Sequence, residues 1–361
     1  MKNTIYLVDI EFIPNRYSCE WKTEFPKFLR SSLEEYDVVV IDGRENVPEA
    51  VTEGAFINFG GTNIYKSDQI AKLAELFTLD VIEDGDHIIF ADAWHPGIIN
   101  VKYMAELLNK QVYLHGLWHA GSYDKWDFLG RIIGNKPWIN SAEKSFYHCY
   151  DYNWFATNFH VNMFLEGVFS DNSHLINPGN RRTIWHKTGW PMEYTKNLIE
   201  FVEFENKENI IVYPHRLAPE KRIDLFKKFS EQEELAGYKF VIPMEMNLSK
   251  SEYHDLLKKS KFVISFAEQE TLGISVFEGL CAGCIPIVPN RLSYQEMYPD
   301  WFKINCDSDD QMIAAAVEFI SFIENDPNNL ADLSAELKYT RDAISKEFFS
   351  ATKIIETIKN V

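Results

Sequence analysis

Short apolar runs alternate with amphipathic stretches in both halves of the chain. In the first half, the pattern predicts strands at residues 4–10, 37–41, 55–59, 88–91, 112–117 and 154–157, with a helix at 98–108. In the second half, it predicts strands at 210–213, 238–242, 261–266 and 285–288, a helix that starts near 272, and helices at 219–229, 250–258, 309–324 and 330–360. Strands that alternate with helices through short loops are typical of parallel sheets. The pattern therefore predicts an α/β protein.

The two series of elements are separated by an acidic stretch, residues 200–209, that lacks a strong core pattern. A length of 361 residues suits two domains. We expect an N-terminal domain at 1–195 and a C-terminal domain at 208–340. A final helical segment, 341–361, is expected to pack back toward the N-terminal domain.

Composition narrows the class of protein. The formal net charge is −18, and Lys and Arg do not cluster, which weighs against extensive contact with a nucleic-acid strand. No run of eighteen apolar residues and no signal-peptide pattern occur, so we expect no membrane span. Five cysteines without framework spacing favour free thiols and a cytoplasmic location.

Residues 265–289, SFAEQETLGISVFEGLCAGCIPIVP, form the most informative stretch. A buried strand, 261–266, ends at the start of this stretch, and helical spacing begins near Leu272. Glu270 is therefore a strand-end carboxylate, and Glu278 lies about one and a half turns inside the helix. The helix N-terminus between them offers unpaired backbone N–H groups to a phosphate. This arrangement suits a nucleotide sugar, because its hydroxyls need acceptors beside a diphosphate.

A second group of candidates follows the strand at 210–213, in the sequence YPHRLAPEKRIDLF. Arg216 and Lys221 stand five positions apart near the carboxyl end of that strand. A guanidinium and an ammonium at this spacing suit the two phosphates of a diphosphate leaving group. We expect this pair to share one site with Glu270 and Glu278.

Three loops that follow strands of the first half also carry ionisable and aromatic residues. Ligands bind beyond the carboxyl ends of parallel strands, so these loops predict a second part of the site. A histidine there can hydrogen-bond a sugar hydroxyl or stabilise developing charge. The candidates are Arg16 and Tyr17 in the first loop, Trp94 and His95 in the second, and His119 and Asp124 in the third.

Together these motifs resemble the retaining, family-4-like GT-B glycosyltransferases (glycosyl transferase group 1), most specifically over residues 210–300. The resemblance implies two Rossmann-like domains whose parallel sheets face a central cleft. It also implies roles on the donor side: Arg216 and Lys221 hold the diphosphate, Glu270 meets the transferred sugar, and Glu278 meets the ribose. The backbone around Leu272 and Gly273 would cover the phosphates, with Thr271 beside it as a further binding candidate. His119 would lie near the reacting carbon, and Asp124 is a further catalytic candidate from its place in the same loop.

The implied reaction moves a hexose or pentose from a UDP- or GDP-sugar to a hydroxyl acceptor with retention, without a metal or a tightly bound cofactor. Two departures concern the pockets: Thr271 replaces the usual glycine, and the loop after the first strand contains no glycine. Arg16 and Tyr17 are the candidates to replace that loop. With Trp94 and His95 they form the expected acceptor side of the site.

Several alternatives stay open. The stretches WHAGSYD and DIEFIPNRY also resemble phage-encoded glycosyltransferases, some of which modify hydroxymethylated pyrimidines in DNA. The acceptor is thus a glycan, a small molecule or modified DNA. A nucleotide-sugar 2-epimerase would share the fold and the donor glutamates but need no acceptor, and a non-catalytic sugar-nucleotide-binding protein would leave the donor intact. The sequence does not fix the oligomeric state.

Overall fold

The structure is a computed structural model that describes residues 2–13, 16–45, 57–169, 184–305, 307–325 and 327–361. It divides into two compact units. The first unit comprises Met1–Met192 and Ala351–Val361, and the second comprises Glu193–Ser350. The last eleven residues therefore belong with the N-terminal part of the chain, although the sequence reaches them after the second unit.

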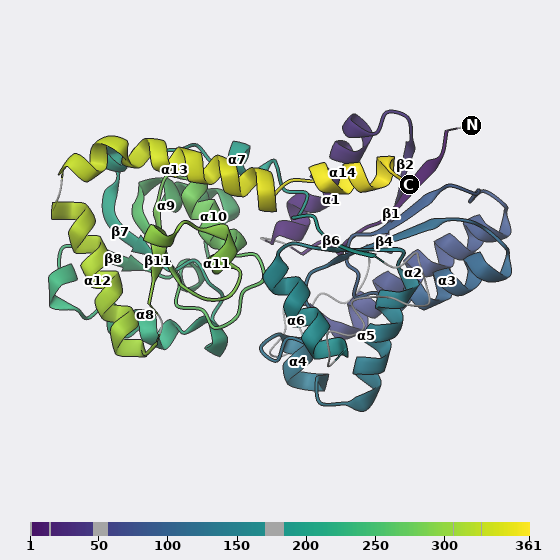
Figure 1. Ribbon diagram of the computed structural model, residues 1–361, viewed down its shortest axis with the longest axis horizontal. Helices are drawn as coiled ribbons and strands as arrows, with labels where there is room; N and C mark the ends of the chain where they lie inside the picture. The colour runs from purple at the N-terminus through teal and green to yellow at the C-terminus, as the bar shows by residue number, and fades with distance from the viewer. Residues whose placement is uncertain (1, 14–15, 46–56, 170–183, 306, 326) are drawn as a thin grey trace. The chain divides into compact units, whose positions relative to one another are not determined.

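The first unit is built on a parallel sheet of the order β2-β1-β3-β4-β5-β6. Its elements are β1 (Thr4–Val8), α1 (Tyr17–Ser32), β2 (Asp37–Ile41), α2 (Phe59–Thr78), β3 (His87–Phe90), α3 (Ile98–Leu107), β4 (Tyr113–Trp118), α4 (Phe128–Ile133), α5 (Pro137–Cys149), β5 (Tyr152–Phe155), α6 (Asn158–Phe169), β6 (Ile184–Lys187) and α14 (Thr352–Lys359). Figure 1 shows α1 and α14 on one side of this sheet and α2, α3 and α5 on the other. Both faces are thus covered, which explains why the central strand β3 is buried throughout.

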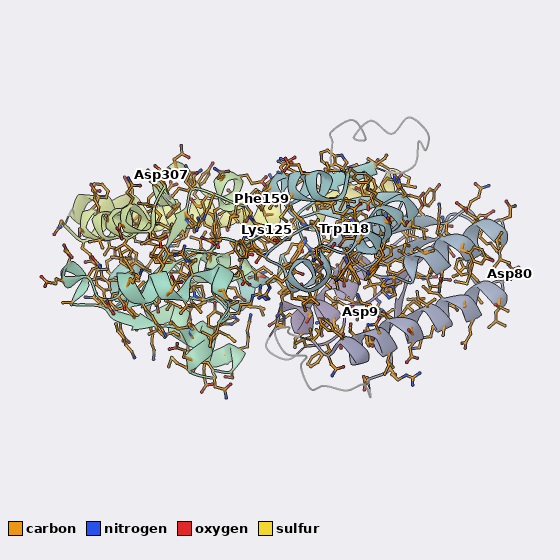
Figure 2. All side chains as sticks on the ribbon, turned by 90° about the horizontal axis from the view of Figure 1, so that it is seen from below. Asp9, Asp80, Trp118, Lys125, Phe159 and Asp307 are labelled. Atoms are coloured by element: carbon orange, nitrogen blue, oxygen red, sulfur yellow. The ribbon has the colours of Figure 1, made fainter. Side chains whose placement is uncertain are left out.

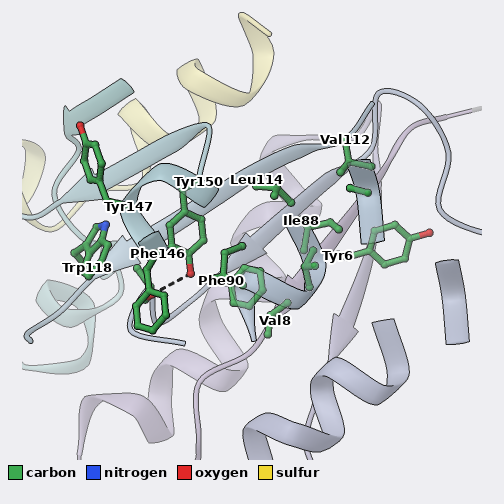
Figure 3. Packing of buried hydrophobic residues seen from close by; sticks show 14 of the residues in the cluster. Tyr6, Val8, Ile88, Phe90, Val112, Leu114, Trp118, Phe146, Tyr147 and Tyr150 are labelled. Atoms are coloured by element: carbon green, nitrogen blue, oxygen red, sulfur yellow. Dashed lines mark hydrogen bonds between the residues drawn. The ribbon is translucent and has the colours of Figure 1, made fainter. Parts of the chain in front are cut away.

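Large aromatic side chains fill the core between this sheet and its helices. Trp118, Phe146 and Tyr150 converge there with the aliphatic side chains of the central strands (Figure 3). The Tyr150 hydroxyl donates a hydrogen bond to the carbonyl of Ala93 at 3.0 Å, so this buried polar group is satisfied. The hydrogen bond anchors the loop after β3 to the core.

The second unit contains a smaller parallel sheet of the order β11-β10-β9-β7-β8. Its elements are α7 (Thr195–Leu198), η2 (Phe204–Asn206), β7 (Glu208–Val212), η3 (Pro219–Lys221), α8 (Ile223–Phe229), η4 (Glu233–Leu235), β8 (Lys239–Val241), η5 (Pro243–Glu245), α9 (Lys250–Lys259), β9 (Ser260–Ile264), α10 (Ile274–Cys281), β10 (Ile285–Pro289), α11 (Tyr294–Met297), η6 (Asp300–Phe302), β11 (Lys303–Ile304), α12 (Asp309–Asn325) and α13 (Pro327–Phe348). Helix α10 packs against α13, and α12 packs against α8.

Three predicted elements differ in the structure. The strand expected at 55–59 is wrong at its end, because Asn58 caps helix α2 by accepting a hydrogen bond from the Gly61 N–H at 2.7 Å; residues 55 and 56 lie outside the described ranges. The helix expected at 219–229 is interrupted at Arg222, which adopts a left-handed conformation. The helix expected at 330–360 is divided because Phe349 leaves it to stack on Phe277, with 4.0 Å between ring centroids.

Within the described ranges, no helix is both long enough and apolar enough to cross a membrane.

Candidate functional site

Each sheet contains a point at which neighbouring strands send their connections in opposite directions. This point lies between β1 and β3 in the first unit and between β7 and β9 in the second. Open parallel sheets bind ligands in the crevice beyond such a pair of strands. The loops after β1, β3, β7 and β9 are therefore where function is expected, and most of the predicted residues lie in them.

In the second unit, the loops after β7 and β9 are tied together by the backbone. The N–H of Glu268 donates to the carbonyl of Glu220 at 2.8 Å. The hydroxyl of Tyr213, at the end of β7, donates to the carbonyl of Lys221 and accepts the N–H of Phe266 at 3.2 Å. These bonds fix the backbone at Lys221 next to the loop after β9.

The side chain of Lys221 reaches across to that loop. Its Nζ lies 3.2 Å from Oε2 of Glu270 and 3.1 Å from Oε1 of Gln269, and it also donates to the carbonyl of Gln269. Burial alone would raise the pKa of Glu270, but the charge of Lys221 and the N–H of Gly273 outweigh it and hold this pKa below its usual value. Glu270 is therefore a carboxylate that can accept hydrogen bonds from hydroxyl groups.

A histidine that the sequence analysis did not select lies beneath this pair. His215 is buried, and its Nε2 lies 2.8 Å from Oγ of Ser265. Burial, followed by the charge of Lys221, lowers the pKa of His215 to about 3, so its imidazole is neutral. It follows β7 in the motif YPHR, where only its position at a strand end could have indicated it.

Arg216 and Arg222 have different surroundings. Arg216 pairs with the buried carboxylate of Glu220, while 30% of its side chain stays exposed. Arg222 instead joins Glu268 at 3.0 Å and Asp309 at 2.6 Å, and so links the loop to helix α12. We therefore infer that Arg222 holds the loop in place, whereas Arg216 stays the candidate for contact with a ligand.

Helix α10 begins beside Glu270 with Gly273 as its N-cap residue. The φ of Gly273 is +72°, and a Cβ there would lie 2.8 Å from the ring of Tyr294. Both facts require glycine at this position. Thr271 and Leu272, just before it, are buried. No side chain caps this end of the helix, so its first N–H groups are oriented to receive an anion.

Glu278, on the same helix, is paired with a residue that the sequence analysis missed. Lys250, the first residue of α9, donates to Oε1 of Glu278, and Nε2 of His254 lies 3.9 Å from the same oxygen. Burial would raise the pKa of Glu278, but Lys250 and His254 lower it below its usual value. Only the tertiary contact between α9 and α10 could have identified Lys250.

The first unit contains a cavity of about 630 Å³ beyond the carboxyl ends of β1 and β3. Five of the residues that the sequence analysis selected line it: Arg16, Tyr17, Trp94, His95 and His119. Asp124 does not line it: the carboxylate of this residue accepts the N–H of Trp126 at 2.9 Å and so stabilises a turn.

Tyr17 and His119 form a fixed pair in this cavity. The Tyr17 hydroxyl lies 2.7 Å from Nδ1 of His119, and Nε2 of His119 lies 2.7 Å from the carbonyl of Ala91. Because a carbonyl only accepts, Nε2 carries the proton, and Nδ1 accepts from the tyrosine. Burial lowers the pKa of His119 to about 4, which keeps the ring neutral. His119 thus orients Tyr17, whose hydroxyl oxygen can still accept a hydrogen bond.

The loop after β3 contributes a second polar group. Lys66 of α2 lies 2.9 Å from the carboxylate of Asp92 and donates to the carbonyl of Trp94 at 2.6 Å. The indole of Trp94 donates to Glu143 at 2.9 Å. His95 accepts the N–H of Gly97 at 3.1 Å and so shapes the loop. These contacts hold the loop rigidly at the edge of the cavity.

Asp9, which follows β1 and is labelled in Figure 2, is a cavity residue that the sequence analysis missed. Its Oδ1 accepts the N–H of Ile10 at 2.8 Å, and its Oδ2 lies 3.6 Å from Nζ of Lys22, which also pairs with Asp42. Burial raises the pKa of Asp9 to about 6, an effect that Lys22 only partly offsets. Its place at the end of the first strand was the signal that could have found it.

The sequence was compared with protein families and with known proteins. No protein family model matches the sequence. A segment of 53 residues, 15% of the chain and 14% of the relative, is 42% identical to the tRNA-queuosine alpha-mannosyltransferase of Drosophila melanogaster. The chain thus corresponds to a small part of that protein's length.

Three solved structures show the similarity in three dimensions. The pneumococcal O-GlcNAc transferase GtfA, in complex with UDP and GlcNAc, has a TM-score of 0.52 at 13% identity, covering 81% of this chain and 59% of its own. Anabaena HepE, in complex with UDP and glucose, has a TM-score of 0.56 at 12% identity, covering 100% of both chains. The catalytic domain of Arabidopsis thaliana starch synthase IV, bound to ADP and acarbose, has a TM-score of 0.60 at 10% identity, covering 99% of this chain and 98% of its own. The chain therefore has the GT-B fold of these glycosyltransferases.

Proposed function

We propose that the chain is a glycosyltransferase that moves a sugar from a nucleoside-diphosphate sugar to a hydroxyl group. The observation that carries this proposal is the meeting of Lys221, Glu270 and the N-terminus of α10 at the switch point of the second sheet. A cation and free N–H groups beside a carboxylate suit a donor that combines a diphosphate with sugar hydroxyls. UDP is the expected nucleotide, because two solved structures with this fold contain it.

In this mechanism the second unit stabilises the departing diphosphate. Lys221, Arg216 and the first N–H groups of α10 compensate the negative charge that develops as the bond between the anomeric carbon and phosphate oxygen breaks. The oxygen of the acceptor hydroxyl forms the new bond, and its proton passes to the departing phosphate. Glu270 orients the sugar and Glu278 the ribose. We propose retention of the anomeric configuration, as the resemblance to family-4-like enzymes implies.

The first unit would bind the acceptor. Its cavity contains the fixed pair of Tyr17 and His119 and the carboxylate of Asp9. In the structure both ring nitrogens of His119 have partners, so we assign this residue the role of orienting Tyr17. A direct bond from His119 to the sugar would require one of these partners to be released.

The test is a thermal-shift screen with UDP-, GDP- and ADP-sugars, because a ligand that binds the native state raises its melting temperature. We expect a UDP-sugar to raise it and the Arg216→Ala variant to lose most of the shift. Incubation with donor alone, followed by NMR, separates transfer from epimerisation. A failure of every nucleotide sugar to bind would overturn the proposal. Transfer that persists in excess chelator would support independence from metals.

A further inference from the structure

The cavity of the first unit is polar at one end and apolar along its wall. Polar groups come from the ends of β1 and β3 and from the start of α1, among them Asp9, Asp92 and Tyr17, and α2 adds Thr62, Asn63 and Lys66. The apolar part of the wall comes from α2, α4 and α5 through six side chains: Phe59, Phe128, Leu129, Ile132, Trp138 and Phe146. A ligand that fits both ends must have a polar group on an apolar body.

Aromatic faces dominate this wall. Phe59 and Phe128 stack with 5.4 Å between ring centroids, although they come from different helices. Trp94 meets Phe146 edge to face at 5.7 Å. Such rings favour another planar ring, which can stack on a face or meet an edge. The apolar lining also includes a solvent-exposed side chain, Trp138, which is 58% exposed.

A glycan or a nucleic-acid strand fits this cavity poorly. Each sugar hydroxyl held against the wall without a partner would cost about 1–3 kcal/mol. Of the two basic side chains that line the cavity, Lys66 is already paired with Asp92. A strand of phosphates would further meet a chain of net charge −18. The cavity volume of about 630 Å³ instead lies in the range of small-molecule sites.

Asp9 supplies the partner that a hydroxyl needs at the polar end. Its carboxylate, only 6% exposed, accepts one N–H at 2.8 Å and has an ammonium 3.6 Å away. A carboxylate has about four acceptor positions, so it can take a further hydrogen bond from a ligand.

We propose that this cavity binds a free small molecule with a planar aromatic ring system, whose hydroxyl group donates a hydrogen bond to Asp9. The ring lies against the aromatic wall between α2, α4 and α5. This names the acceptor class and rests on the proposed glycosyltransferase function, but binding to the cavity does not require the donor.

The test uses 2-naphthalenemethanol as the probe, titrated by its fluorescence against the full chain without donor. The variant Ile132→Glu places a charge in the cavity lining at a side chain that is 50% exposed, so we expect the protein to fold. Leu107→Glu, at a position of α3 that is 67% exposed and does not line the cavity, is the matched control. We expect Ile132→Glu to weaken binding at least about tenfold, because a charge beside an apolar ligand loses water. The control should stay within about twofold of wild type by the same argument.

Equal affinities in the two variants would overturn the proposal. Displacement of the probe by maltotriose would also overturn it. The same holds for displacement by an oligonucleotide that contains hydroxymethylcytosine, if the affinity of this oligonucleotide falls as the salt concentration rises. Donor binding is measured on the same variants with UDP: if UDP fails to bind wild type while the probe binds, the proposed transfer fails and the aromatic site stands.

The role of Asp9 is tested with the methyl ether of the probe, which has no hydroxyl to donate. Wild type should prefer the alcohol to the ether, and Asp9→Asn should lose most of this preference, because a neutral amide accepts more weakly than a carboxylate. Lys22 and Asp42 are the charged groups that face Asp9, and both stay in place in this variant. An unchanged preference in Asp9→Asn would contradict the assignment of the hydroxyl to this residue.

Discussion

The ammonium of Lys221 lies 3.2 Å from the carboxylate of Glu270, although 49 positions separate the two residues. The contact joins the loops that follow β7 and β9, the strands that flank the switch point of the second sheet. Burial alone would raise the pKa of Glu270, and the charge of Lys221 is the largest effect that lowers it, so Glu270 stays a carboxylate. A diphosphate can then take the place of one hydrogen-bond partner of Lys221. Glu270 would still be able to accept a hydrogen bond from a sugar hydroxyl.

Replacing Lys221 tests the diphosphate assignment. Lys221→Ala removes a cation aimed at charge that develops in the transition state, so we expect kcat/KM to fall about 10²–10³-fold, or ~2.7–4 kcal/mol. Lys227→Ala is the control, because Lys227 is 60% exposed on α8 and pairs only peripherally with Glu245. Steady-state kinetics with a UDP-sugar measure both. Equal rates for the two variants would exclude Lys221 from the site.

Gly273 offers a test of the helix start. Gly273→Ala forces a side chain into a left-handed backbone and against Tyr294, 2.8 Å away. We expect a loss of stability of about 1–2 kcal/mol and a weakened affinity for UDP. Gly237→Ala is matched to it, since a Cβ at Gly237 meets nothing within 4 Å and its φ is not in the left-handed region. Calorimetry of both variants with and without UDP decides; a Gly273→Ala protein that binds UDP normally would contradict the phosphate seat.

Acid should weaken the first unit through His119. Burial lowers the pKa of His119 from its ordinary 6.5 to about 4 in the folded protein, so the unfolded chain binds more protons between these values and stability falls as pH drops through that window. Between pH 7 and pH 5 this accounts for up to about 2 kcal/mol. His119→Gln, which keeps a donor for Ala91, should reduce the pH dependence by that amount. Urea unfolding followed by tryptophan fluorescence at both pH values measures it.

The control for this effect is His254→Gln on α9, in the second unit. It should leave the pH dependence of the first unit unchanged. Identical pH profiles for wild type and His119→Gln would show that the imidazole of His119 is not held neutral by its surroundings.

Asp9 has the opposite effect on stability. Its pKa is about 6 when folded against 3.8 in the reference state, so the folded protein binds more protons between these values and stability falls as pH rises from about 4 to 6. Asp9→Asn should therefore stabilise the protein at pH 7 by up to about 3 kcal/mol, and the gain should shrink toward zero near pH 4. Melting temperatures across this range test it. A variant less stable than wild type at pH 7 would mean that the ion pair with Lys22 outweighs burial.

The pattern of apolar runs determined the α/β class, and most strands lie within a few residues of their expected positions because buried parallel strands are short and almost wholly apolar. The sequence also predicted that Glu270 follows a strand and that Glu278 lies in the next helix, because a strand, a turn and a helix that are adjacent in the chain form from local patterns. The strand prediction at 55–59 failed at Asn58, because the side chain of this residue caps a helix that begins within the apolar run.

The tertiary structure determined which residues from different elements contact one another, and no local sequence pattern contains this information. Lys250 meets Glu278 only because α9 packs on α10, and Asp9 lines a cavity only because β1 and β3 are neighbours whose connections diverge. Asp124, a catalytic candidate in the sequence, accepts the N–H of Trp126 in a turn and does not line the cavity. Sequence spacing fixes which residues share an element, whereas sheet order and helix packing determine which elements meet, and both site assignments depend on the latter.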